Sequence, residues 1–79
     1  MRTTEQRLRN VVVDSLGIAE DEVSRDSNFA DDFGADSIDL AYFVQDIEKE
    51  FCISIPDSDA EKISTFGEAV DYINQLLKR

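Results

Sequence analysis

The residues of this 79-residue chain best suited to chemistry are an aspartate and a serine that stand side by side, Asp36 and Ser37. Aspartate is a strong helix N-cap, because its carboxylate can accept hydrogen bonds from the free N–H groups that open a helix. Ser37 is then expected to be the first residue of that helix, with its side chain projecting outward beside the positive end of the helix dipole. The pair therefore predicts a hydroxyl displayed at a helix N-terminus.

No residue of the chain is suited to activate this hydroxyl. Histidine is absent, so a Ser-His-Asp triad cannot form, and a serine without a neighbouring base is a poor nucleophile. Asp36 and Asp39 could be paired catalytic carboxylates, but the first is better explained as a cap and the second is expected on an exposed helical surface. We therefore predict that the chain is not an enzyme and that Ser37 is a substrate for another protein's active site.

The aspartates near Ser37 could also indicate a calcium site. An EF-hand loop that starts at Asp26 has Asp31 where glycine is needed and Ser37 where glutamate is needed. A loop that starts at Asp32 has Ser37 at the glycine position. Cys52 is the only cysteine, so a Cys/His cluster is excluded as well. We predict no metal centre, although millimolar magnesium or calcium should raise the melting temperature by relieving repulsion between acids.

The helix that displays Ser37 is indicated by the apolar residues that follow it. They fall at i, i+3, i+4, i+7 and i+11, in the order Leu40, Phe43, Val44, Ile47 and Phe51. This spacing lies on one face of a helix that runs from Ser37 to Phe51. Gly34 supplies backbone freedom just before the cap, where another protein's active site must approach closely.

A second main helix is predicted before this one. Thr3 or Thr4 can cap it, with Gln6 in capping-box spacing from Thr3, and Gly17 is a natural stop. Residues 17–35 then form a long connection without sustained periodicity, which in a small domain usually has a function or packs on itself. Its expected anchors in the core are Ile18, Val23, Phe29 and Phe33.

Two helices are predicted after a turn over residues 52–56. Residues 57–63 favour a short helix, with Ser58 and Glu61 in capping-box spacing. Thr65 and Glu68 repeat that spacing before an amphipathic segment that reaches residue 77. The fold class is therefore all-α: a small four-helix bundle of three main helices plus one short helix, with a long loop between the first two. Residues 1–79 are expected to form a single domain.

The formal net charge of −10 is the strongest feature of the composition. It argues against nucleic acid as a partner, since phosphates would be repelled, and it predicts partners with basic surfaces. Residues 14–39 contain nine acids and one base, Arg25; the acids are Asp14, Glu20, Asp21, Glu22, Asp26, Asp31, Asp32, Asp36 and Asp39. No apolar run could cross a membrane. The absence of a disulfide framework and of a signal peptide favours a cytoplasmic monomer.

The segment Gly34-Ala35-Asp36-Ser37-Ile38 resembles the G-x-D-S-L attachment motif of acyl carrier proteins, with isoleucine in place of the usual leucine. The resemblance extends through the acidic helix and Ile55-Pro56-Asp57 to the final amphipathic helix. It implies that a phosphopantetheinyl transferase moves 4′-phosphopantetheine from coenzyme A onto Ser37. Acyl groups would then be held on this arm as thioesters and delivered to acyl-transfer or synthase enzymes.

The resemblance also implies roles for other residues. Asp36, Asp39 and Glu48 match positions that meet basic docking patches on partner enzymes, and Ile38 and Tyr42 lie on the same helix. Seven further residues match positions around a cavity that can hold the acyl chain: Phe29, Val44, Ile47, Ile55, Ala60, Ile63 and Ala69. We expect a bound chain to pack against Ile47 and Ile63.

Two departures from the family pattern concern the cargo. Tyr42 and Lys49 stand where carriers of fatty acid synthesis usually have acids, and an aromatic residue on a docking face replaces charge steering by contact area. Fatty acid, specialised lipid and polyketide biosynthesis therefore all stay open as pathways. The alternative from another class is an acidic helical interaction module without a prosthetic group, for which the motif around Ser37 would have no purpose.

Overall fold

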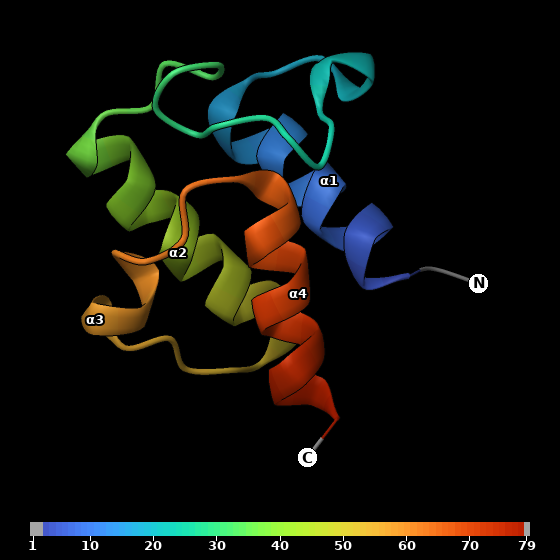
Figure 1. Ribbon diagram of the computed structural model, residues 1–79, viewed down its shortest axis with the longest axis vertical. Coiled ribbons are helices and arrows are strands. Elements are labelled where there is room, and N and C mark those ends of the chain that lie inside the picture. The colour runs from blue at the N-terminus through green and yellow to red at the C-terminus, as the bar shows by residue number, and fades with distance from the viewer. Residues whose placement is uncertain (1–2, 79) are drawn as a thin grey trace.

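The computed structural model describes residues 3–78, and within them the chain forms four α-helices and no strand. The helices are α1 (Thr4–Leu16), α2 (Ser37–Phe51), α3 (Asp57–Ala60) and α4 (Phe66–Leu77), and a short 3₁₀ helix, η1, spans Glu20–Glu22. Figure 1 shows the three long helices around a common centre, with the short α3 at the edge of the bundle. The predicted all-α bundle of three main helices and one short helix is confirmed.

Side chains cap the N-termini of α1 and α4. The hydroxyl of Thr3 accepts from the Gln6 N–H at 3.1 Å, and the hydroxyl of Thr65 accepts from the Glu68 N–H at 3.2 Å. The Glu68 carboxylate completes a capping box by accepting from the Thr65 N–H at 3.0 Å. The box expected at Thr3 is only half formed, because the Gln6 side chain donates to Asn10 instead.

The residues that follow α1 and α2 both have a left-handed backbone conformation. Gly17 follows α1 with φ 69°, as the sequence predicted, and Cys52 follows α2 with φ 56°. Glycine adopts this backbone conformation without steric cost, whereas a residue with a Cβ atom, such as Cys52, adopts it less readily. After Cys52 the chain runs back from the end of α2 to α3 (Figure 1).

The helix α3 is shorter than the sequence indicated. The prediction of a helix over 57–63 is wrong beyond its fourth residue, and the capping box of Ser58 and Glu61 is wrong, because Pro56 is the N-cap and no side chain bonds there. The Glu61 N–H still bonds Asp57 O, whereas the N–H groups of Lys62 and Ile63 bond carbonyls three residues back, which tightens the chain into a turn. Ile63 follows this turn and packs against the core.

The core lies between the three long helices. Its buried members from them are Leu8, Val11, Val12, Phe43, Ile47, Phe51, Phe66, Ala69, Val70 and Ile73. Burying a large apolar side chain of this kind stabilises the fold by about 1.5–3 kcal/mol. No helix within residues 3–78 is long and apolar enough to span a membrane.

The long loop is anchored by the apolar residues that the sequence indicated. Val23 and Phe29 are buried, while Ile18 and Phe33 are half-buried and pack against the same core. The ring of Phe29 lies 5.1 Å from that of Phe43 on α2, centroid to centroid. The loop therefore contributes to the core that holds α2.

Backbone hydrogen bonds also tie this loop to the start of α4. The Phe29 N–H donates to Ser64 O at 3.0 Å, and the Gly67 N–H donates to Arg25 O at 2.9 Å. A Cβ atom on Gly67 would lie 2.9 Å from that carbonyl oxygen, so glycine is what lets the two segments meet. The Arg25 guanidinium bonds Asp71 at 2.8 Å and Glu5 at 3.2 Å, and these bonds raise the pKa of Arg25 above its ordinary value.

Candidate functional site

Ser37 is the first residue of α2, and the local sequence explains why the helix begins there. Asp36 has an extended backbone (φ −90°, ψ −176°), and its carboxylate accepts from the Asp39 N–H at 2.9 Å. The Asp39 carboxylate accepts in return from the Asp36 N–H at 3.3 Å. These two bonds form a capping box, which satisfies two of the N–H groups that a helix start leaves free. The predicted N-cap is confirmed, and the sequence did not indicate the reciprocal bond from Asp39.

The backbone before the cap is fixed as well. Gly34 has φ 66°, a left-handed conformation that glycine adopts most readily. The next residue, Ala35, is buried, and its N–H donates to Phe29 O at 3.0 Å. Phe29 therefore connects the approach to Ser37 with the segment before α4, through its bonds to Ala35 and Ser64.

The side chain of Ser37 is exposed. Its hydroxyl forms no hydrogen bond with any of residues 3–78, and the whole sequence has no histidine that could take its proton. A negative group attached to this oxygen would lie at the N-terminus of a fifteen-residue helix, where free N–H groups and the helix dipole favour negative charge. The arrangement suits a hydroxyl that another enzyme modifies with a phosphate ester.

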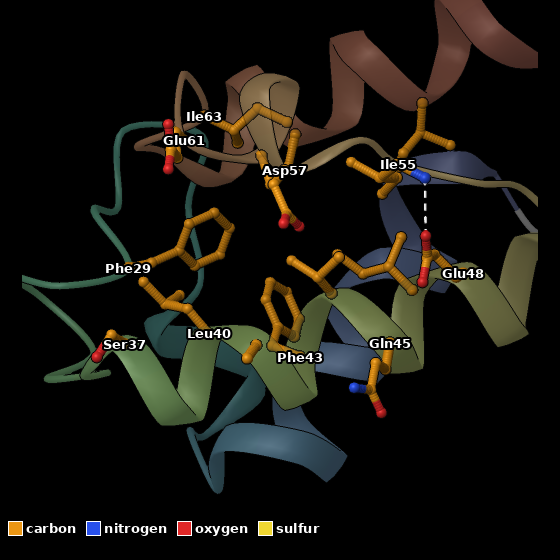
Figure 2. A pocket seen from close by; sticks show the side chains of 16 residues that line it. Phe29, Ser37, Leu40, Phe43, Gln45, Glu48, Ile55, Asp57, Glu61 and Ile63 are labelled. Carbon is orange, nitrogen blue, oxygen red and sulfur yellow. Dashed lines mark hydrogen bonds between the residues drawn. The ribbon is translucent and has the colours of Figure 1, made fainter.

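A cavity of about 540 Å³ lies beside Ser37, between α2 on one side and α3 and α4 on the other. Its volume falls within the range of about 300–1,000 Å³ that is usual for small-molecule sites. Figure 2 shows Ser37 at one end of this space and the rings of Phe29 and Phe43 near it. The cavity thus opens next to the hydroxyl that the capping box displays.

All seven residues expected around an acyl chain line this one cavity: Phe29, Val44, Ile47, Ile55, Ala60, Ile63 and Ala69. Their role in holding a chain stays a prediction. The remaining lining residues were not predicted to line a cavity: Leu40, Ala41, Phe43, Gln45, Glu48, Asp57, Glu61 and Ile73, besides Ser37 itself. The helical spacing of Leu40 and Phe43 with Val44 and Ile47 was the signal that could have identified those two.

Glu48 has a structural bond that competes with its expected role in docking. It is half-buried, and its carboxylate accepts from the Ile55 N–H at 2.7 Å, the bond drawn in Figure 2 at the opposite end of the cavity from Ser37. Since Ile55 is 7% exposed, this carboxylate satisfies a backbone donor that water reaches poorly. Glu48 therefore fixes the loop between α2 and α3.

The other residues expected to meet partner enzymes lie on the open surface of α2. Asp36 and Asp39 are exposed, although each carboxylate also serves the capping box. Ile38 is 65% exposed and Tyr42 is 63% exposed, and they are the two most exposed large hydrophobic residues among residues 3–78. Residues four apart lie on the same helix face, so these two form one apolar patch next to Ser37.

One carboxylate near the site has a shifted pKa. Glu68 accepts hydrogen bonds from the backbone N–H groups of Ser64 and Thr65, and these bonds hold the pKa of Glu68 below its ordinary value. The carbonyl of Ser64 in turn accepts from the Phe29 N–H. The capping box of α4 thus supports the wall of the cavity that Phe29 forms.

The described part of the chain holds no group of three or more His, Cys, Asp or Glu side chains that could bind a metal ion. The thiol of Cys52 is exposed, and it lies at the end of α2 away from Ser37.

Comparison with known protein families matches most of the chain. The model of a family described as "phosphopantetheine attachment site" matches residues 6–73. The matched segment includes α2, the capping box and every residue that lines the cavity.

Proposed function

The chain belongs to the phosphopantetheine attachment-site family, whose members carry covalently bound 4′-phosphopantetheine, and from this premise we propose that Ser37 is the residue that bears the arm. The observation that carries the proposal is the hydroxyl of Ser37, which is exposed at a capped helix start and adjoins a cavity. No other serine among residues 3–78 combines these three features.

The residues present fit such a group. The bound arm supplies a terminal thiol on which acyl groups are carried as thioesters. The start of α2 favours the phosphate through its dipole and free N–H groups. Asp36 keeps the helix start rigid, since its carboxylate is engaged with the Asp39 N–H. The chain offers no base for Ser37, so the transferase must remove the proton, and the chain itself is a carrier without catalytic activity.

We propose further that the cavity shelters the acyl chain. Ile47 from α2 and Ile63 after α3 face it from opposite sides, and an alkyl chain placed between them would be removed from water at a gain of about 0.8 kcal/mol per CH₂. NMR of the acylated protein tests this. Methyl shifts at Ile47 and Ile63 support shelter, and shifts confined to the surroundings of Ser37 count against it.

Partner enzymes are proposed to dock on α2. Asp36 and Asp39 give a negative field beside Ser37 that speeds association with basic patches. Ile38 and Tyr42 add an exposed apolar contact beside the attachment point. Such a surface suits partners that must bind quickly and release. Glu48 takes a smaller part, because its carboxylate is bonded to Ile55.

The cargo pathway is proposed as fatty acid, specialised lipid or polyketide biosynthesis. Tyr42 and Lys49 favour a dedicated pathway over housekeeping fatty acid synthesis, because they stand on the docking helix where housekeeping carriers usually have acids. The family match argues against the alternative of an interaction module without a prosthetic group. Incubation of the apo protein with coenzyme A and a broad-range transferase separates the two, because only a carrier gains the mass of the arm.

A further inference from the structure

The cavity beside Ser37 combines an apolar interior with an acidic lining. Its interior is formed by Phe43, Ile47, Ala69 and Ile73, each at most 4% exposed. Three carboxylates from separate segments also line it: Glu48 near the end of α2, Asp57 at the start of α3, and Glu61 in the turn after α3. No Lys or Arg side chain of residues 3–78 lines the cavity.

The three acids line the cavity at different points along its length. Glu48 is held by its 2.7 Å bond to the Ile55 N–H, so its charge is fixed at the end of the cavity opposite Ser37. In Figure 2 the carboxylate of Asp57 extends from α3 toward α2, between these two ends. Glu61 lies nearer the end occupied by Phe29. A chain that enters beside Ser37 therefore meets negative charge along its course and at its far end.

We propose that this cavity selects its cargo by charge: it shelters acyl groups whose far end is uncharged and leaves those that end in a carboxylate outside. The inference rests on the proposed function, because it concerns an acyl group held at Ser37. An acyl unit that ends in a carboxylate would stay on the surface, open to partner enzymes, while a neutral chain would be protected. One carrier could thus present two kinds of acyl group differently.

The physical basis is repulsion added to desolvation. A carboxylate that leaves water for an apolar interior loses solvation that no cation there replaces. Like charges a few ångströms apart near a protein surface repel strongly enough to shift an equilibrium tenfold or more. An amide end has nearly the same size and shape as a carboxylate but carries no charge. Comparison of these two ends therefore isolates the effect of charge.

The test uses the protein loaded through coenzyme A thioesters of equal chain length. The three acyl groups are octanoyl, the half-thioester of octanedioic acid, and its primary amide. Intact mass first shows that the protein carries one acylated arm, and the absence of the arm from Ser37→Ala assigns it to Ser37. Methyl NMR shifts at Ile47, Ile63 and Ala69 and the melting temperature then report whether the chain occupies the cavity.

We expect the octanoyl and amide forms to shift the three methyl groups and to raise the melting temperature. The carboxylate form should resemble the protein that carries the unacylated arm, with a sheltered population lower by about tenfold or more. Equal shifts for the amide and carboxylate forms would overturn the inference. Loss of shelter for both ends, with octanoyl still sheltered, would overturn it too, because polarity and not charge would then be selecting.

Isosteric variants assign the effect to the acids. In the Asp57→Asn, Glu61→Gln double variant the carboxylate form should regain shelter by several-fold, while the control Glu20→Gln, Asp21→Asn removes equal charge from η1 and should restore nothing. A carboxylate chain that stays excluded from the folded double variant contradicts the role of these acids. If the double variant melts below the assay temperature, Asp57→Asn alone decides in the same way. If none of the three acyl forms attached at Ser37, the carrier function itself would be refuted.

Discussion

Asp36 and Asp39 each accept a hydrogen bond from the other's backbone N–H, and Ser37 lies between them in the sequence. This reciprocal pair ends the loop and begins α2 at one defined residue. Two acidic side chains next to the attachment hydroxyl thus have a structural role besides their charge. They present Ser37 at a helix start without bonding to its hydroxyl.

Substitution at Asp36 should therefore change stability according to capping ability. We expect Asp36→Ala to lower the free energy of unfolding by about 0.5–2 kcal/mol, because the Asp39 N–H loses its acceptor. Asp36→Asn should retain nearly all of the stability, since asparagine is an equally good N-cap. Thermal melting measures both, and each kcal/mol corresponds to about 4–8 °C for a domain of this size. Equal melting temperatures for the two variants would contradict the capping role.

Glu48 should behave as a residue of the fold more than of the docking surface. Glu48→Ala leaves the Ile55 N–H without its acceptor, at a cost of about 1–3 kcal/mol. Glu48→Gln keeps an oxygen in the same place and should lose less. Denaturant unfolding of the two variants checks this. If Glu48→Ala changed stability by no more than about 0.5 kcal/mol, as exposed residues usually do, the bond would have no structural weight.

The loss of stability at acidic pH should depend on Glu68. The pKa of Glu68 lies below its ordinary value in the folded protein. At pH values above the ordinary pKa, the ionised carboxylate therefore stabilises the fold, and this contribution is lost as the pH falls through the lower pKa of the folded state. Glu68→Gln should therefore melt below wild type at neutral pH, and the difference should vanish in acid.

The control for this titration is Glu20→Gln, which removes one exposed negative charge from η1. It should show no such pH-dependent loss, since no hydrogen bond to Glu20's side chain occurs within residues 3–78. Melting temperatures measured from neutral pH to about pH 2 compare the two. A difference between Glu68→Gln and wild type that stays constant over this range would show that ionisation of Glu68 is not the cause.

The exposed pair Ile38 and Tyr42 should affect recognition but not folding. Tyr42→Ala should leave stability within about 0.5 kcal/mol, because the side chain is 63% exposed. It should lower kcat/KM of the transferase by about 5- to 30-fold, if the ring is an interface anchor worth about 1–2 kcal/mol.

Leu77→Ala is the matched control, since Leu77 is another exposed hydrophobic residue, 44% exposed, near the C-terminal end of α4. It should leave the kinetics of the transferase unchanged. Equal losses in both variants would remove the specific role of the α2 surface.

The long helices could be predicted from sequence because their signals are local. A cap at Thr3, Asp36 or Thr65 and apolar spacing after it were sufficient to place α1, α2 and α4 to within a residue. The predicted length of α3 was too great because Ser58 and Glu61 have capping-box spacing without forming a capping box. There the chain turns after four residues, and Ile63 packs against the core.

The site was predictable in part for the same reason. The position of Ser37 follows from the cap, and the apolar wall of the cavity follows from helix periodicity and family resemblance. The bond from Ile55 to Glu48 and the acidic lining depend on where residues 52–63 turn back along α2. No local pattern encodes that path, so the sequence did not indicate the structural role of Glu48 or the place of Asp57.

The most direct test of the central claim is the intact mass of the protein after incubation with coenzyme A and a broad-range phosphopantetheinyl transferase. We predict that wild type gains one phosphopantetheine and that Ser37→Ala, with an unchanged fold, gains none. Ser58→Ala, which alters another exposed serine at α3, should be loaded like wild type. An adduct on Ser37→Ala, or none on folded wild type under conditions that load a known carrier, would contradict the account.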